Sequence, residues 1–231
     1  MTESDDLTKD GQDPATAHVY PRPLTEGLPV TGAWQEGDPE GNRQFTQVHP
    51  DRSFVLEGGG VLEEVTMAYE TWGTLSPNAD NAVLVCHALT GDQFASGTNP
   101  ITKKDGWWNY ALGPGKAIDT DKYFIIAANV IGGCMGSFGP SNINPETKKP
   151  YGTNFPVITI NDMVNAQYNL LEHFKIEKLF CVIGGSMGGM QVLQFVSNFP
   201  DKAHTAIPIA CTASHSAQNI ALNELGRQSI M

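Results

Sequence analysis

The chain has 231 residues, of which 40% are hydrophobic and 17% charged, a balance typical of one large α/β domain. Its formal net charge of −11 argues against a nucleic-acid or anionic-membrane surface, because both select for basic patches. No apolar stretch approaches the ~20 residues that a membrane-spanning helix needs, and the acidic N-terminus lacks a signal-peptide pattern. We therefore expect a cytoplasmic protein.

Four cysteines are spread along the chain without a C-x-x-C pair: Cys86, Cys134, Cys181 and Cys211. Three of them lie in or beside apolar runs, where a thiol is usually a small core residue. We therefore expect reduced thiols, with neither disulfides nor a metal site.

The N-terminal part differs in composition from the rest. Residues 1–17 are polar and predict a disordered tail, and we expect residues 1–50 to be largely disordered or irregular and residues 51–231 to form the core. Residues 54–56 and 65–69 look like two early strands, separated by glycines 58–60. Polar and apolar residues alternate along the second, which predicts a half-solvated antiparallel edge.

Apolar runs predict strands that are covered on both faces: 82–86, 123–128, 179–183 and 206–210. Pro208 counts against a central position for the last of them. Helical patterns lie between and after these runs. Thr159 and Asp162 have capping-box spacing before one helix, a second runs from 187 to 198 and is stopped by Pro200, and a third begins near Ser214 or Ser216 and is still running at Met231. Alternating strands and helices predict a parallel sheet with right-handed crossovers.

The connection 129–156 is long and rich in glycine and proline. Long structured loops at the carboxyl ends of parallel strands usually serve a ligand site, although an ordinary surface excursion is the alternative.

Residues 184–188 read GGSMG, the G-x-S-x-G signature of a nucleophile elbow, with the required strand before it and helix after it. Small residues at Gly184 and Gly188 would let the turn close, and Ser186 would stand at the positive end of a helix. We predict that Ser186 is a catalytic nucleophile; the alternative is a glycine-rich turn with an idle serine.

An oxyanion hole needs two converging backbone N–H groups. In this kind of site one comes from the residue after the nucleophile, here Met187, and the other from a loop after an earlier strand, for which we choose Leu89. His87 in the same loop is a tempting base, but a histidine there more often braces the loop.

The other members of a Ser–acid–His triad are difficult to place. His204 precedes the last predicted strand, at the end of the sheet opposite the elbow, and His215 arrives one strand after the nucleophile without an acid to orient it. We therefore expect an α/β-hydrolase fold, with a mostly parallel sheet and helices on both faces, truncated before the triad Asp and His.

Seven segments give a more specific resemblance: 69–75 (YETWGTL), 87–91 (HALTG), 106–108 (GWW), 129–136 (NVIGGCMG), 139–141 (GPS), 184–191 (GGSMGGMQ) and 216–221 (SAQNIA). From about residue 54 to 231 the chain resembles the homoserine O-acetyltransferases, acyltransferases of methionine biosynthesis with an α/β-hydrolase fold. The resemblance implies a ping-pong reaction in which Ser186 takes an acetyl group from acetyl-CoA, a co-substrate, and L-homoserine then accepts it. It implies no bound cofactor, and a homodimer for the full-length protein. The family's triad His and Asp, its substrate-binding Arg and most of its helical lid would lie beyond Met231.

Three alternatives remain open. The first is an esterase or other hydrolase on the same fold. The second is a non-catalytic fragment in which Ser186 is a relic. The third is a related transferase that uses a succinyl donor or a serine acceptor.

Overall fold

The computed structural model describes residues 33–34, 37–49, 51–99 and 102–229. Contacts divide the chain into Met1–Gly32 and Ala33–Met231, and every element named below belongs to the second unit. The disordered tail that the sequence predicts for residues 1–17 lies outside the described residues.

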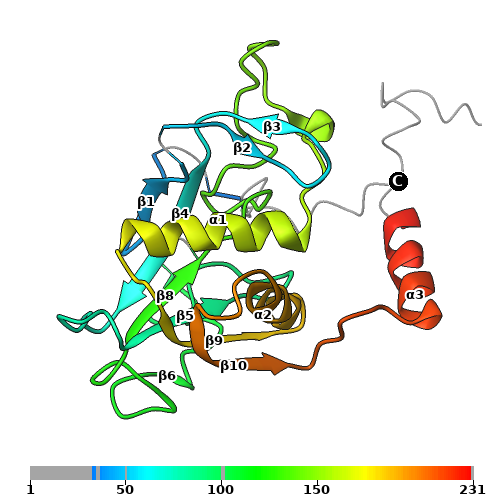
Figure 1. The fold of residues 1–231 in the computed structure, drawn as a ribbon. Helices are drawn as coiled ribbons and strands as arrows, with labels where there is room; N and C mark the ends of the chain where they lie inside the picture. The colour runs from blue at the N-terminus through cyan, green and yellow to red at the C-terminus, as the bar shows by residue number, and fades with distance from the viewer. Residues whose placement is uncertain (1–32, 35–36, 50, 100–101, 230–231) are drawn as a thin grey trace, which may run out of the picture. The chain divides into compact units, whose positions relative to one another are not determined.

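A six-stranded sheet forms the centre of this unit, in the order β1-β4-β8-β5-β9-β10 (Figure 1). Its strands are β1 (Gln44–Gln47), β4 (Thr66–Trp72), β8 (Phe124–Ala128), β5 (Ala82–Cys86), β9 (Leu179–Gly185) and β10 (Ala203–Ile209). The last four in this order are parallel, whereas β1 and β4 pair antiparallel at one side. The other elements are β2 (Phe54–Val55), β3 (Val61–Leu62), β6 (Leu112–Gly113), β7 (Ile118–Asp119), η3 (Gly152–Asn154), α1 (Ile160–His173), α2 (Met187–Asn198) and α3 (Ala217–Gln228).

The central strands are apolar because both of their faces are covered. Every residue of β5 and β8 is buried, as expected for interior parallel strands. One face packs against α1 and α2, where Leu84 and Phe195 join the same apolar cluster. Val83 faces the other way, into a second cluster covered by Trp107 and Trp108. Among the described residues, that second face is covered by the segment around β6 and β7 instead of by a helix.

The early strands differ from the sequence prediction. Phe54–Val55 pairs with Val61–Leu62 in a separate small hairpin and does not enter the main sheet. The main sheet instead takes Gln44–Gln47, which lies in the segment 1–50 that we expected to be largely irregular. Because this strand covers one side of β4 and β8 covers the other, β4 is an interior strand whose residues 67–70 are all buried. The predicted half-solvated edge at 65–69 is therefore wrong.

The first helix begins where the sequence predicts, and the second has both predicted boundaries. The Thr159 side chain accepts from the Asp162 N–H while the Asp162 carboxylate accepts from the Thr159 N–H, so the capping box is confirmed. The elbow helix α2 ends at Asn198, as expected before Pro200. The third helix is capped by Ser216 but ends at Gln228, which corrects the expectation that it is still running at Met231.

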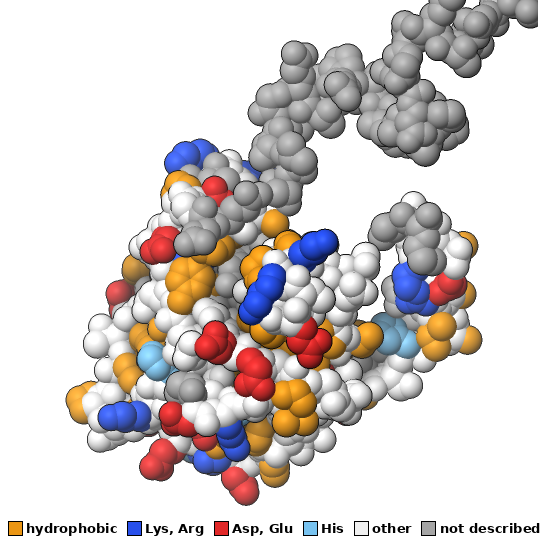
Figure 2. Space-filling view, turned by 90° about the horizontal axis from the view of Figure 1, so that it is seen from above, with side chains coloured by type: hydrophobic (Ala, Val, Ile, Leu, Met, Phe, Trp, Pro, Cys, Tyr) orange, Lys and Arg blue, Asp and Glu red, His pale blue; other side chains and the backbone are white. Residues whose placement is uncertain are grey.

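The last described strand and helix are the least covered. β10 pairs with β9 alone, six of its seven residues are exposed, and its proline, Pro208, thus lies in an outer strand, where proline is tolerated. No residue of α3 is buried. On the face seen in Figure 2, basic side chains are scattered among acidic and apolar ones. Among the described residues, no helix is long and apolar enough to cross a membrane.

Candidate active site

The turn from β9 to α2 holds Ser186 in an unusual backbone conformation. Its φ is 57° and its ψ is −120°, a combination that costs a non-glycine residue free energy. Two hydrogen bonds hold it there: the Ser186 N–H donates to the carbonyl oxygen of Ile209 at 3.0 Å, and the Ser186 carbonyl oxygen accepts from Met190 at 3.1 Å. The residue itself is exposed. The predicted strand–turn–helix arrangement is therefore present, with an accessible serine at its apex.

Glycines let the neighbouring backbone approach the turn closely. A Cβ on Gly188 would lie 2.1 Å from the carbonyl oxygen of Cys86, and one on Gly184 would lie 2.7 Å from the same oxygen. Both distances are far below van der Waals contact, so only glycine fits without a shift. Gly189, which the sequence analysis did not single out, is also constrained, because its Cβ would meet Cys211 Sγ at 2.7 Å.

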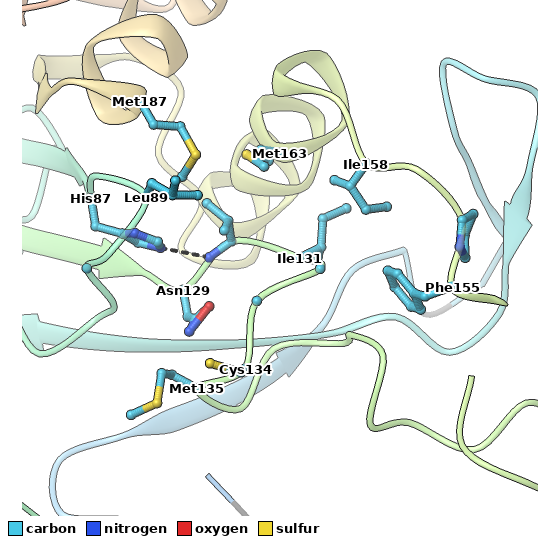
Figure 3. A pocket seen from close by; sticks show the side chains of 15 residues that line it. His87, Leu89, Asn129, Ile131, Cys134, Met135, Phe155, Ile158, Met163 and Met187 are labelled. Carbon is cyan, nitrogen blue, oxygen red and sulfur yellow. Dashed lines mark hydrogen bonds between the residues drawn. The ribbon is translucent and has the colours of Figure 1, made fainter. Parts of the chain in front are cut away.

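The two predicted oxyanion donors lie against one cavity of about 390 Å³. Leu89 and Met187 both line it, and Figure 3 shows the Met187 side chain directed toward Leu89. Among the described residues, neither the Leu89 N–H nor the Met187 N–H has a hydrogen-bond acceptor. Met187 is the first residue of α2, where unpaired N–H groups and the helix dipole favour negative charge. Two residues from separate elements, whose N–H groups have no acceptor in the described part of the chain, thus line one hollow.

His87 braces the loop that carries Leu89. It is 3% exposed; its Nε2 accepts from the Val130 N–H at 3.1 Å, and its Nδ1 lies 2.7 Å from the Ala88 carbonyl oxygen. These partners require a neutral ring that is protonated on Nδ1. Burial lowers its pKa, which supports the same state. The bracing role that the sequence suggested fits this geometry better than the role of a base, since both ring nitrogens are engaged.

The long 129–156 connection supplies much of the cavity wall. Residues 129–135, Phe155 and Pro156 line it, together with Ile158 just before α1 and Met163 in the first turn of α1 (Figure 3). Asn129 is 1% exposed, and its Oδ1 has no hydrogen-bond partner among the described residues. Its place after a predicted strand does not mark it in the sequence, because an amide there is unremarkable until its partners are known.

The remaining candidate residues are away from this hollow. His204 is an exposed residue of β10, and His215 follows it in the exposed connection to α3; neither lines the cavity. All four cysteines are free. Within the described part of the chain, no group of three or more His, Cys, Asp or Glu side chains could hold a metal ion.

The contact between two buried glutamines was not predicted. Gln167 of α1 and Gln191 of α2 are both 0% exposed and hydrogen bond to each other. The available signal was a polar residue on the buried face of an apolar helix, one turn after Met187.

Comparisons with known proteins agree with this geometry. A homoserine O-acetyltransferase of Pelagibacter ubique is 74% identical over 181 residues, which are 78% of this chain and 49% of that protein. The structure of a homoserine O-acetyltransferase from Bacillus anthracis matches with a TM-score of 0.70 at 30% identity, covering 76% of this chain and 48% of the other. The structure of esterase E22 matches with a TM-score of 0.71 at 34% identity, covering 79% and 50%. The chain spans about half the length of the curated relatives it matches.

These likenesses confirm the resemblance to the homoserine O-acetyltransferases that seven sequence segments indicated. The family model of the alpha/beta hydrolase fold matches residues 81–223 of the 231. The elbow strand, Ser186 and the elbow helix all lie inside the matched range. This chain therefore belongs to the alpha/beta hydrolase fold family.

Proposed function

We propose that the protein containing this chain transfers an acetyl group from acetyl-CoA to the side-chain hydroxyl of L-homoserine through an acyl-Ser186 intermediate. The observation that carries the proposal is an exposed serine on a strained elbow, followed by Met187, which lines a cavity together with Leu89. The N–H groups of Leu89 and Met187 have no acceptor among the described residues.

The chemistry follows from this arrangement. Ser186 Oγ attacks the thioester carbonyl carbon and loses its proton to a general base, while the Leu89 and Met187 N–H groups bind the developing oxyanion. The tetrahedral intermediate collapses, the C–S bond breaks, and CoA leaves as the thiol after taking up the proton. The homoserine hydroxyl then attacks the acyl-serine, loses its proton to the same base, and Ser186 is regenerated. The resemblance implies that the base is a histidine oriented by an aspartate from a part of the protein outside this chain.

The substrates are supported by relatives whose name is homoserine O-acetyltransferase, at 54–74% identity. The resemblance also supports a cytoplasmic homodimer without a resident cofactor as part of the same proposal. Transfer instead of hydrolysis requires that the amino-acid hydroxyl outcompete water in a closed site.

The test uses the full-length protein that contains these residues. We expect stoichiometric CoA release from acetyl-CoA alone, with one acetyl group on the peptide that carries Ser186, and continuous CoA release only when L-homoserine is added. Succinyl-CoA and L-serine, offered in place of each substrate, should react more slowly. CoA release without a label on Ser186 would contradict the acyl-enzyme. If there were no CoA release and no label, the alternative in which Ser186 is a non-catalytic relic would be favoured.

Ester hydrolysis is a second candidate, favoured by the likeness to esterase E22 at a TM-score of 0.71. It differs in the fate of the acyl-serine, which water would release as free acetate. Acetate formed at the same rate with and without L-homoserine, and no O-acetylhomoserine, would establish hydrolysis in place of transfer.

A further inference from the structure

We infer that Gln191 is a positioning residue that sets the separation between the two backbone N–H groups of the oxyanion hole. The inference rests on the proposed function, in which those N–H groups belong to Leu89 and Met187. It assigns a role in catalysis to a side chain that does not itself touch the substrate.

The Gln191 amide joins the two elements that carry the donors. Its Nε2 donates to the carbonyl oxygen of His87 at 3.1 Å and lies 3.4 Å from that of Met187. His87 is two residues before Leu89 in the loop after β5, and Met187 is the first residue of α2. One planar NH₂ group therefore ties the loop that carries Leu89 to the first turn of the elbow helix.

A second glutamine fixes the direction in which this amide points. Gln191 Oε1 accepts from Gln167 Nε2 of α1 at 2.6 Å, so the Gln191 NH₂ must face the loop. Gln167 Oε1 in turn lies 3.7 Å from Cys86 Sγ. Burial raises the pKa of the Cys86 thiol to about 12, so this sulfur keeps the proton that it donates to the amide oxygen. The hydrogen bonds therefore run from Cys86 in β5 through the two glutamines of α1 and α2 to His87, the residue that follows β5.

Burying two amides is costly unless their hydrogen bonds are made, and an apolar pair of similar volume would pack the same space at no such cost. Both glutamines are 0% exposed, and each uses its oxygen and its nitrogen. An apolar pair has no N–H to donate, so it could not hold the His87 carbonyl oxygen at a fixed distance from the first turn of α2. Because an error of ~1 Å in the placement of a catalytic group can cost about 10²-fold in rate, a rigid tie at this position matters for the chemistry.

The experiment measures acylation of Ser186 in the full-length protein, from the burst of CoA released by acetyl-CoA. In Gln191→Met the volume is kept and the amide is lost. This variant should acylate about 10- to 100-fold more slowly, while the acetyl-CoA concentration for half-maximal rate stays unchanged. A merely structural role would not lower the acylation rate while leaving the acetyl-CoA concentration for half-maximal rate unchanged.

A matched control and a double variant keep the result interpretable. Gln194 lies on the same helix, but its amide bonds Asn198 Oδ1 at 2.8 Å and not the loop, so Gln194→Met should acylate at the wild-type rate. Gln167→Met combined with Gln191→Met removes both buried amides and should unfold near the wild-type temperature, yet remain slow. Wild-type rates in the folded double variant, or equal rates in Gln191→Met and Gln194→Met, would overturn this inference alone. Absence of acylation in the wild type would overturn the proposed function, and this inference with it.

Discussion

The imidazole of His87 accepts a hydrogen bond from the Val130 N–H at 3.1 Å, which ties the loop after β5, where Leu89 lies, to the wall of the cavity. On its other side the ring donates to Ala88, whose carbonyl oxygen also accepts from Gly91 at 2.9 Å. The loop is therefore closed on itself and anchored to the connection that follows β8 by one neutral side chain. Protonation of Nε2 would set its N–H against the Val130 N–H, so two donors would face each other and this hydrogen bond would be lost.

This relationship predicts an acid-sensitive fold. Burial lowers the pKa of His87 in the folded protein, so the unfolded chain binds the proton first as the pH falls. The stability contributed by the neutral ring is present above the ordinary pKa of 6.5 and is lost as the pH falls through the lower folded value. Thermal unfolding should therefore show a decrease in this range that is smaller in His87→Gln, whose amide offers a donor and an acceptor but does not titrate. Equal pH dependence in the two proteins would contradict the assignment.

Glu70 predicts the opposite trend at higher pH. Its side chain is 1% exposed, and Oε1 has no hydrogen-bond partner among the described residues. Burial raises its pKa to about 8, with Asp92 adding to the shift and Arg43 opposing it. The folded state thus holds a proton that the unfolded chain has already lost. The stability that this proton contributes is present below about pH 4.5 and is lost as the pH rises toward 8.

Unfolding temperatures of the wild type and of Glu70→Gln measure this effect. Because the amide imitates the protonated acid at every pH, the variant should lose less stability than the wild type between pH 5 and pH 8. A variant that loses as much as the wild type would show that Glu70 is ionised in the folded protein.

The elbow glycines predict a contrast between two neighbouring positions. A Cβ at Gly188 would meet backbone atoms of Cys86 and His87 at 2.1–3.0 Å, whereas one at Gly185 would meet nothing closer than the Ile209 carbonyl oxygen at 4.0 Å. Gly188→Ala should therefore destabilise the protein by about 1–3 kcal/mol, as overpacking does, and Gly185→Ala should be neutral or slightly stabilising. Denaturant unfolding of the pair tests this, and similar values for both would argue against the close approach at Gly188.

The sequence predicted an element well where the residues that determine it lie close together in the chain. The boundaries of α2 follow from a buried strand, a glycine turn and Pro200 within one short stretch, and the cap of α1 follows from Thr159 and Asp162 alone. By contrast, Gln44–Gln47 is a short, mostly polar strand that exists because β4, whose paired residues run from Thr66 to Tyr69, offers it a partner, and nothing local marks it.

The site shows the same division. Ser186, Leu89 and Met187 belong to motifs whose spacing can be read directly. The tie between Gln191 and His87 joins residues 104 positions apart, and a lone glutamine in an apolar helix does not say which carbonyl it meets. Exposure of β10 and α3 likewise depends on which segments cover them and not on their own residues.

Strain at Ser186 predicts that two inactive variants differ in stability. Ser186→Ala and Ser186→Gly should both abolish acyl-enzyme formation. Glycine tolerates a φ of 57°, so Ser186→Gly escapes a strain of about 1–3 kcal/mol, against which the greater freedom of the unfolded chain costs about 0.4–1 kcal/mol. The strain is the larger effect, so Ser186→Gly should unfold at a higher temperature than Ser186→Ala. Retained acylation in either variant would exclude Ser186 as the nucleophile.

The oxyanion role of Leu89 can be separated from any role of its side chain. Leu89 is 78% exposed, and its N–H has no acceptor among the described residues, so replacing it by proline breaks no N–H hydrogen bond within that part of the chain. Leu89→Pro removes the donor and should lower the acylation rate by about 10²–10³-fold, whereas Leu89→Ala keeps the donor and should cost far less. Unfolding temperatures of both variants control for distortion of the loop by the proline ring. Equal losses of rate would assign the effect to the side chain or the loop shape, because a backbone donor survives in alanine and not in proline.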